Sequence, residues 1–195
     1  MKKYLALLLS IISLPLWAFS EQELIAQLQQ SHNVQGNFIQ QRFLKALPQP
    51  IETQGKFALV AQKGLLWQMQ RPFETQLRIT PKGIEQWNGT QWVANGNMAQ
   101  SQQIRLFLGL LSGDLSGLKS HFDLALSGNA KQWALQLTPN SLLMKQIFTS
   151  IMIEGGKVVT AMQLNETQGD RTQIQFQHLQ INQALPPAVK QALAQ

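Results

Sequence analysis

Cysteine is absent from this 195-residue sequence, so no disulfide can stabilise the fold and no lipid is expected on a cysteine. Charged residues make up only 13% of the chain, and its Lys and Arg residues are scattered singly although they outnumber the acidic residues by 16 to 10. Proteins that bind nucleic acid usually carry a basic cluster or stripe, which this sequence lacks. We therefore expect no nucleic-acid partner, and a surface that is polar mainly through glutamine.

Motifs that indicate an enzyme or a metal protein are missing as well. His32, His121 and His178 are far apart in the sequence, and no HExxH pattern or cysteine completes a metal-binding set. In the segment 113–117, Ser116 stands one position too late for a nucleophile elbow. We therefore predict that the chain is not an enzyme and uses no metal or cofactor.

The first 18 residues have the pattern of a secretory signal peptide. Two lysines precede an apolar run over 5–14, and Ala18 supplies the small residue that a signal peptidase prefers. The run of about ten residues is roughly half of what a membrane-spanning helix needs. We expect cleavage after residue 18, a single domain over 19–195 and a periplasmic location, with an uncleaved membrane anchor as the alternative.

Hydrophobic alternation predicts that most of the domain is an antiparallel β-sheet. Apolar residues recur at every second position over 57–61, 65–69 and 77–79, and turn residues at 81–83 and 88–89 separate these segments. The same period returns over 122–126, 133–137, 147–153, 158–164 and 174–176. A phase slip after Phe176 predicts a β-bulge near His178.

Three short helices are predicted, over 21–31, 139–145 and 188–194. A fourth segment, 101–112, would form a helix that is apolar nearly all round, and such a helix needs burial on more than one side. With a curved sheet it could enclose an apolar space that a hydrophobic ligand fills. Alternatively, the helix is permanent core that fills a half-barrel, and the periodicity does not choose between the two.

Several short motifs follow one another along the chain: Phe38-Ile39-Gln40, Gly55-Lys56-Phe57, Leu65-Leu66-Trp67, Pro72 with Leu77, Leu137-Thr138-Pro139 and Gly169-Asp170-Arg171-Thr172. Their order and spacing resemble the LolA-type periplasmic lipoprotein carrier family over essentially all of 19–195. The resemblance implies a mainly β fold, an unclosed antiparallel β-barrel of about eleven strands, covered by short helices as in LolA and LolB.

The resemblance also implies roles for particular residues. The strands would supply the walls of a lipid-binding cavity, and the helical segment would supply its lid. The implied wall residues are Phe38, Phe57, Leu59, Ala61, Leu65, Trp67, Met69, Leu77 and Ile79. The implied lid residues are Ile104, Phe107, Leu108 and Leu111.

The chain departs from that family at two adjacent positions. Lipoprotein carriers of this type have an arginine followed by a proline after the strand that the glycine opens, and the arginine side chain bonds to the lid. Here the corresponding residues are Ala61 and Gln62. The latch is therefore missing, or Arg42 or Arg78 replaces it from another strand.

The resemblance implies a monomeric periplasmic carrier that binds the acyl chains of lipoproteins or other lipids. It would receive them from an inner-membrane donor and move them toward an outer-membrane acceptor. The alternative is a periplasmic sensor or assembly module that uses the same half-barrel to bind a protein partner without shuttling.

The N-terminal pattern generates the first prediction. The chain exported by a bacterial host should lose residues 1–18, because the apolar run is too short to span a bilayer. Intact-mass measurement of the periplasmic product checks this. A product that retains Met1, or one that is found only in membranes, would contradict the prediction.

Overall fold

A single eleven-stranded antiparallel sheet dominates the computed structural model, which describes residues 19–94, 108–109 and 114–194. The strand order is β6-β5-β4-β3-β2-β1-β11-β10-β9-β8-β7. Each strand pairs with its neighbour in the sequence, except that β1 also pairs with β11. Within the described residues, β6 and β7 form the two edges and do not pair with each other, so the curved sheet is unclosed.

The strands have these bounds: β1 Asn33–Phe43, β2 Ile51–Val60, β3 Gly64–Arg71, β4 Thr75–Thr80, β5 Gly83–Trp87, β6 Trp92–Ala94, β7 Phe122–Asn129, β8 Gln132–Pro139, β9 Phe148–Gly155, β10 Val159–Glu166 and β11 Arg171–Ile181. The helices have these bounds: α1 Glu21–Gln29, α3 Ser116–Lys119, α4 Leu142–Ile147 and α5 Pro187–Ala192. None of the described helices has the length and apolar content needed to cross a membrane.

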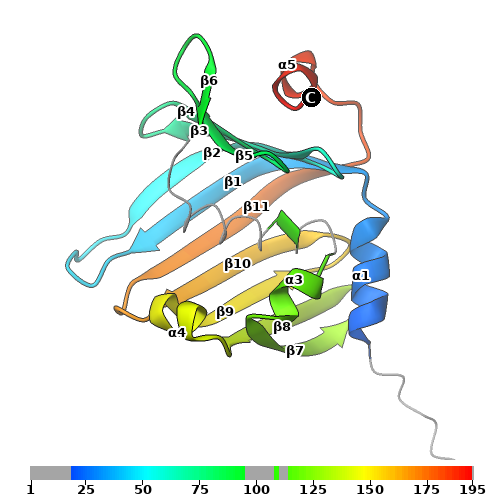
Figure 1. Cartoon of the computed structure of the whole chain (residues 1–195), viewed down its shortest axis with the longest axis vertical. Coiled ribbons are helices and arrows are strands. Elements are labelled where there is room, and N and C mark those ends of the chain that lie inside the picture. Colours follow the sequence, from blue (N-terminus) through cyan, green and yellow to red (C-terminus); the bar gives the residue numbers. More distant parts are fainter. Residues whose placement is uncertain (1–18, 95–107, 110–113, 195) are drawn as a thin grey trace, which may run out of the picture.

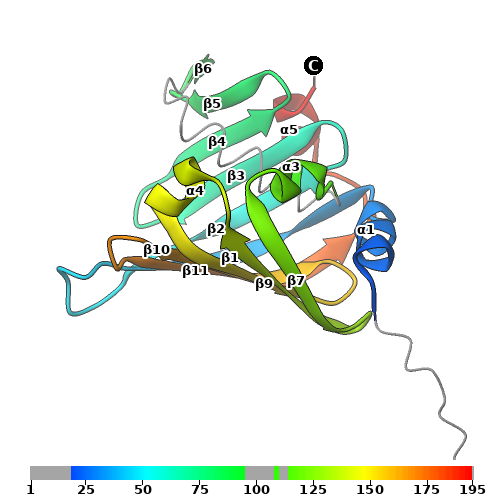
Figure 2. The same cartoon turned by 60° about the horizontal axis from the view of Figure 1, so that its bottom comes forward.

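The sheet bends into a half-barrel, and the helices lie on different sides of it (Figures 1 and 2). Helix α1 runs across one end of the strands, while α3 and α4 lie on the inner, concave side. Helix α5 covers the outer side of β2 to β4, where its Val189 and the following Leu193 pack against Ala58 and Leu66. The molecule therefore has one face that surrounds a core and one that mostly meets solvent.

The main core fills the concave side at the α1 end. Leu24 and Leu28 of α1 are buried there, and Leu115 and Leu118 at α3 belong to the same cluster. Ser20 begins α1 with a capping box, in which its hydroxyl accepts from the Glu23 backbone N–H and the Glu23 carboxylate accepts from the Ser20 backbone. This cap fixes the start of α1, so that its apolar side meets the sheet.

The predicted elements correspond closely to the observed ones. The eleven-stranded unclosed sheet, the helices near 21–31, 139–145 and 188–194, and the bulge near His178 are confirmed. At the bulge, the pairing of β1 with β11 shifts between Gln35 and Asn37, and His178 adopts a positive φ of 52°. Gly36 fits opposite the bulge because a Cβ there would lie 2.7 Å from the Gln177 carbonyl oxygen.

Leu24 provides a test of the closed end, because its side chain is fully buried. Leu24→Ala should lower the free energy of unfolding by about 2 to 5 kcal/mol, since it leaves a cavity between α1 and the sheet. Leu142→Ala, at an exposed position, serves as the matched control and should change it by about 0.5 kcal/mol or less. Urea unfolding measures both, and equal effects would mean that α1 does not close the core.

Candidate functional site

The concave face brings together most of the predicted wall residues. Phe57 pairs with Trp67 and Trp67 pairs with Leu77, so these three side chains share one face of the sheet. Leu59, Leu65 and Ile79 form the next row on that face. The described face also includes Phe38 and Met69, which pack in the same apolar cluster.

Four aromatic rings from four different strands form the centre of this face. The rings of Phe38 and Trp67 stack with centroids 3.7 Å apart at an angle of 22°, and Phe57 and Phe176 lie 4.8 Å apart. Trp67 meets Phe176 edge-on at 6.2 Å. The sequence predicts Phe176 only as a strand residue. The pairing of β1 with β11 brings its ring next to the other three, and local periodicity does not reveal that pairing.

Gly55 makes the aromatic stack possible. It lies opposite Phe38 in the ladder, and a Cβ at this position would stand 2.8 Å from Cε1 of Phe38 and 2.0 Å from the Gln68 carbonyl oxygen. Any other residue would have to push the ring or the neighbouring strand away. The glycine that opens the Gly55-Lys56-Phe57 motif thus positions the ring of Phe38 over β2.

Over β3, β4, β10 and β11, burial of the concave face decreases away from the end that α1 covers. At the end that α1 covers, Leu59, Leu65 and Ile79 are buried. The opposite end, here called the mouth, is bounded by the β1–β2 loop, the β3–β4 turn, α4 and the β10–β11 turn (Figures 1 and 2). Five apolar side chains toward the mouth are half-buried, namely Trp67, Met69, Leu77, Leu164 and Ile174, whereas Leu137, Met144 and Phe148 at the same end are buried.

Only one of the four predicted lid residues lies within the described part of the chain. Leu108 is helical, packs against the main core and lines a small cavity of about 180 Å³ together with Leu59 and Pro81. Ile104, Phe107 and Leu111 lie outside the described residues, so their predicted lid role stays a prediction.

The two candidate latch arginines lie in different places. Arg42 is at the mouth, where its Nη2 lies 3.7 Å from Glu166 Oε1 and 3.9 Å from Asp170 Oδ2. Arg78 belongs to the outer face, where its Nε donates to Glu85 at 2.7 Å and its Nη1 donates to the Ala192 carbonyl oxygen at 3.0 Å. Arg78 therefore fastens α5 to β4 and β5, and its guanidinium points away from the concave face.

Ala61 and Gln62 are in the β2–β3 turn at the α1 end, beyond the last residue of β2. The Ala61 N–H donates to the His32 carbonyl oxygen at 2.9 Å, and Gln62 has a φ of 62°. Proline is restricted to a φ of about −65° and could not adopt this backbone. Ala61 and Gln62 stand where the family resemblance places an arginine and a proline. The backbone of the turn at position 62 excludes that proline.

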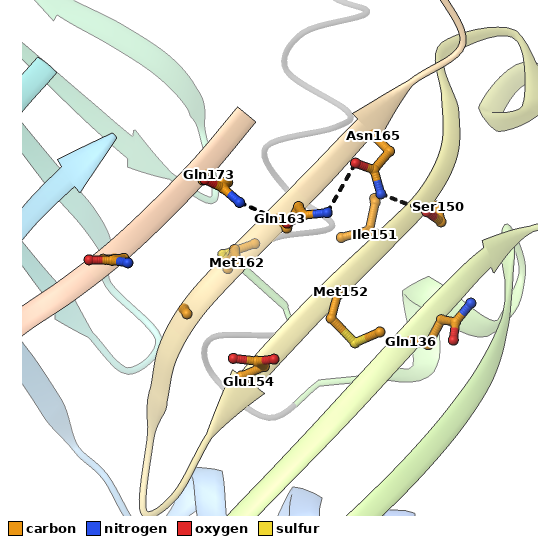
Figure 3. A pocket seen from close by; sticks show the side chains of 11 residues that line it. Gln136, Ser150, Ile151, Met152, Glu154, Met162, Gln163, Asn165 and Gln173 are labelled. Carbon is orange, nitrogen blue, oxygen red and sulfur yellow. Dashed lines mark hydrogen bonds between the residues drawn. The ribbon is translucent and has the colours of Figure 1, made fainter. Parts of the chain in front are cut away.

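The outer face carries a second depression of a different kind. It is an open groove of about 280 Å³ over β8 to β11, and its lining includes the amides of Gln136, Gln163, Asn165 and Gln173 (Figure 3). Gln173 donates to Gln163 at 2.9 Å, Gln163 donates to Asn165 at 3.2 Å, and Asn165 donates to Ser150 at 2.9 Å. This linked polar chain is unsuited to an acyl chain, which leaves the concave face as the candidate lipid site.

The family of the chain can be read from its sequence. Residues 29–189 match the family described as "Outer membrane lipoprotein carrier protein LolA". The chain belongs to the LolA family. It is 26% identical over 171 residues to the outer-membrane lipoprotein carrier proteins of two Pseudomonas putida strains, GB-1 and KT2440, which covers 85% of this chain and 79% of each relative.

A solved structure of the Pseudomonas aeruginosa MucA/MucB complex contains a chain with a similar fold, at a TM-score of 0.53 and 14% identity. The similarity covers 85% of this chain, which spans 57% of that one. Proteins of the LolA family are carriers rather than enzymes, in agreement with the prediction that this chain is not an enzyme. No group of three or more potential metal ligands occurs among the residues that the structure describes.

The contact of Arg78 with Glu85 generates a pH-dependent prediction. The hydrogen bond from Arg78 lowers the pKa of Glu85 below its ordinary value. A carboxyl with a lowered folded-state pKa stabilises the fold at pH values above its unfolded pKa, and this stabilisation is lost as the pH falls through the folded-state pKa. Glu85→Gln should therefore be less stable than the natural chain at neutral pH, and the difference should shrink in acid.

Urea unfolding at a series of pH values from neutral to strongly acidic measures this difference. Glu74→Gln is the control, because Glu74 is exposed and makes no ion pair among the described residues. A difference between Glu85→Gln and the natural chain that stays constant over the whole range would show that the charge of Glu85 does not help to hold α5.

Proposed function

We propose that this protein is a periplasmic carrier that shields the acyl chains of a lipoprotein or another lipid on the concave face of its half-barrel. The observation that carries the proposal is the group of apolar side chains on that face that stay half-buried toward the mouth. One end is closed by α1, whereas Trp67, Met69 and Leu77 remain half-buried toward the mouth. A guest that enters at the mouth would cover apolar side chains that the fold leaves partly uncovered.

The chemistry of capture is burial, with no bond made or broken. Each methylene group that leaves water contributes about 0.8 kcal/mol, so one acyl chain of about fourteen carbons could supply roughly 10 kcal/mol before the cost of ordering it. Release then requires a competitor for the same chain. An inner-membrane donor and an outer-membrane acceptor would supply and remove the cargo, as the membership of a lipoprotein carrier family suggests.

The turn at Ala61 and Gln62 bears on how cargo is released. A hydrogen bond from a buried charged group contributes about 1.5 to 3 kcal/mol, enough to shift an equilibrium between open and closed forms more than tenfold. This chain has no arginine at position 61 to make such a bond. We infer that its cargo exchanges more readily than that of carriers with the arginine.

The remaining parts of the proposal concern the state of the protein in the cell. Residues 1–18 act as a cleaved signal peptide and 19–195 form one lipid-binding domain, which works as a monomer in the periplasm. The pattern of residues 1–18 and the single sheet support this part of the proposal.

Native mass spectrometry of the protein purified gently from its own periplasm tests the function. We expect a bound lipid at one per chain, identified by extraction, and its loss in Trp67→Asp, because a carboxylate on the apolar face must be desolvated or admit water. Gln163→Asp places the same carboxylate on the outer face and should keep the lipid.

Circular dichroism confirms that the variants are folded before they are compared. A folded Trp67→Asp protein that keeps its lipid would show that the cargo binds elsewhere. A natural protein that carries no lipid, and binds none from vesicles, would overturn the carrier function in favour of the sensor or assembly module that binds a protein partner.

A further inference from the structure

Large apolar side chains that remain exposed gather at the mouth. Six such residues are found in the described part of the chain: Leu47, Ile51, Phe73, Val93, Leu142 and Leu143. Leu47 lies in the β1–β2 loop, and Ile51 is the first residue of β2. Phe73 lies in the β3–β4 turn, and Leu142 and Leu143 belong to α4. Phe73 and Leu142 are the most exposed, at 79% and 82%.

These three elements lie at the same end of the half-barrel in both views (Figures 1 and 2). The end covered by α1 lies opposite, and β6, with Val93, stands at the edge of the sheet. The exposed side chains therefore form an apolar rim around the mouth, defined by Leu47, Ile51, Phe73, Leu142 and Leu143. Solvent exposure of several large apolar groups in one place marks an interaction surface.

Each element of the apolar rim also carries an exposed cation close in sequence. Lys45 precedes Leu47, Arg71 precedes Phe73, and Lys145 follows Leu142 on α4. Within the described residues, no ion pair joins these three cations to a carboxylate, whereas Arg42 at the same end is paired with Glu166 and Asp170. The exposed carboxylates Glu52, beside Ile51, and Glu74, beside Phe73, share these elements, so the rim has a net charge of +1 (3 minus 2).

We propose that the apolar rim docks directly on the surface of an anionic lipid bilayer, with the mouth facing the membrane. Apolar side chains that enter the acyl boundary, beside lysines and arginines that remain at the head groups, form the usual combination in interfacial membrane binding. The small net positive charge of the rim favours anionic over neutral head groups.

The arrangement of the rim favours a bilayer over a protein partner. A stable protein interface buries about 800 Å² per partner in one continuous patch. The rim side chains instead belong to separate segments of the chain that lie at one end of the half-barrel. A fluid surface can admit such separated side chains without a matching shape. This docking goes beyond the proposed carrier function, because the protein without bound lipid should also bind to the bilayer.

Vesicle binding of the full mature chain tests the proposal. The protein should co-sediment with vesicles that contain phosphatidylglycerol and much less with vesicles of phosphatidylcholine alone. Phe73→Asp and Leu142→Asp, each made alone, should weaken the binding by about tenfold or more. Val93→Asp is the matched control, because it adds a carboxylate at an exposed apolar residue away from the rim.

A charge series provides a second, independent variant. Lys45→Gln, Arg71→Gln and Lys145→Gln together should weaken binding at low salt by on the order of a hundredfold. The control removes Lys63, Lys131 and Lys157 in the same way, since these exposed lysines lie in turns at the α1 end and change the net charge equally. Binding of an apolar fluorescent probe without vesicles shows that each variant is folded and that its concave face is intact.

Three outcomes would overturn the membrane docking: no binding of the natural chain to anionic vesicles, equal losses in the rim and control variants, or a dimer in solution that the rim variants dissociate. Rim variants that keep vesicle binding but lose delivery of cargo to a membrane protein would also overturn it and assign the rim to that protein. Vesicle binding without probe binding would support the docking while contradicting the carrier function, so the two failures are distinguishable.

Discussion

The structure depends on an apolar inner face that the fold covers at one end and covers only in part at the other. The curved sheet turns alternate residues of nearly every strand inward, and α1 buries that surface where Leu24 and Leu28 meet it. Toward the mouth the same face continues through Trp67 and Met69, and these two side chains are only half-buried. Apolar area that stays near water costs free energy, so a partner that covers it is stabilised by burial. The closed end supplies stability, and the open end is the part of the face that remains available for binding.

Local patterns in the sequence predicted the strands and helices well because each depends on neighbouring residues. Alternation over 57–61 and 65–69 depends only on the two faces of a strand, and the slip after Phe176 reported a bulge for the same reason. The number of strands and their closure into a half-barrel came from the resemblance to a family. Pairing of β1 with β11 joins residues at opposite ends of the domain, and no local pattern encodes it.

Predicting the site was harder, since it depends on which face and which end each residue occupies. Arg78 was a candidate latch, yet it follows Leu77 by one position and therefore lies on the opposite face with Leu66. Ala61 continues the alternation of β2 but falls in the turn after the strand. Leu164 and Ile174 were recognised as strand residues and not as part of the face near the mouth. Exposed turn residues such as Phe73 follow no hydrophobic period. Their grouping with other exposed apolar residues depends on which turns lie at the same end of the folded sheet, and local sequence does not give this.

The unpaired edges of the sheet have a mechanical consequence. In a closed barrel, the circumference is fixed by the number of strands and their stagger, and it can grow only if ladder hydrogen bonds break. Here the described β6 and β7 share no ladder, so small changes of twist at each strand pair can add up to a wider or narrower gap between them while every existing ladder stays intact. The width of the half-barrel is therefore not fixed by its strand pairing. Ligands of different width could be accommodated by changes in the twist and curvature of the sheet, without local unfolding.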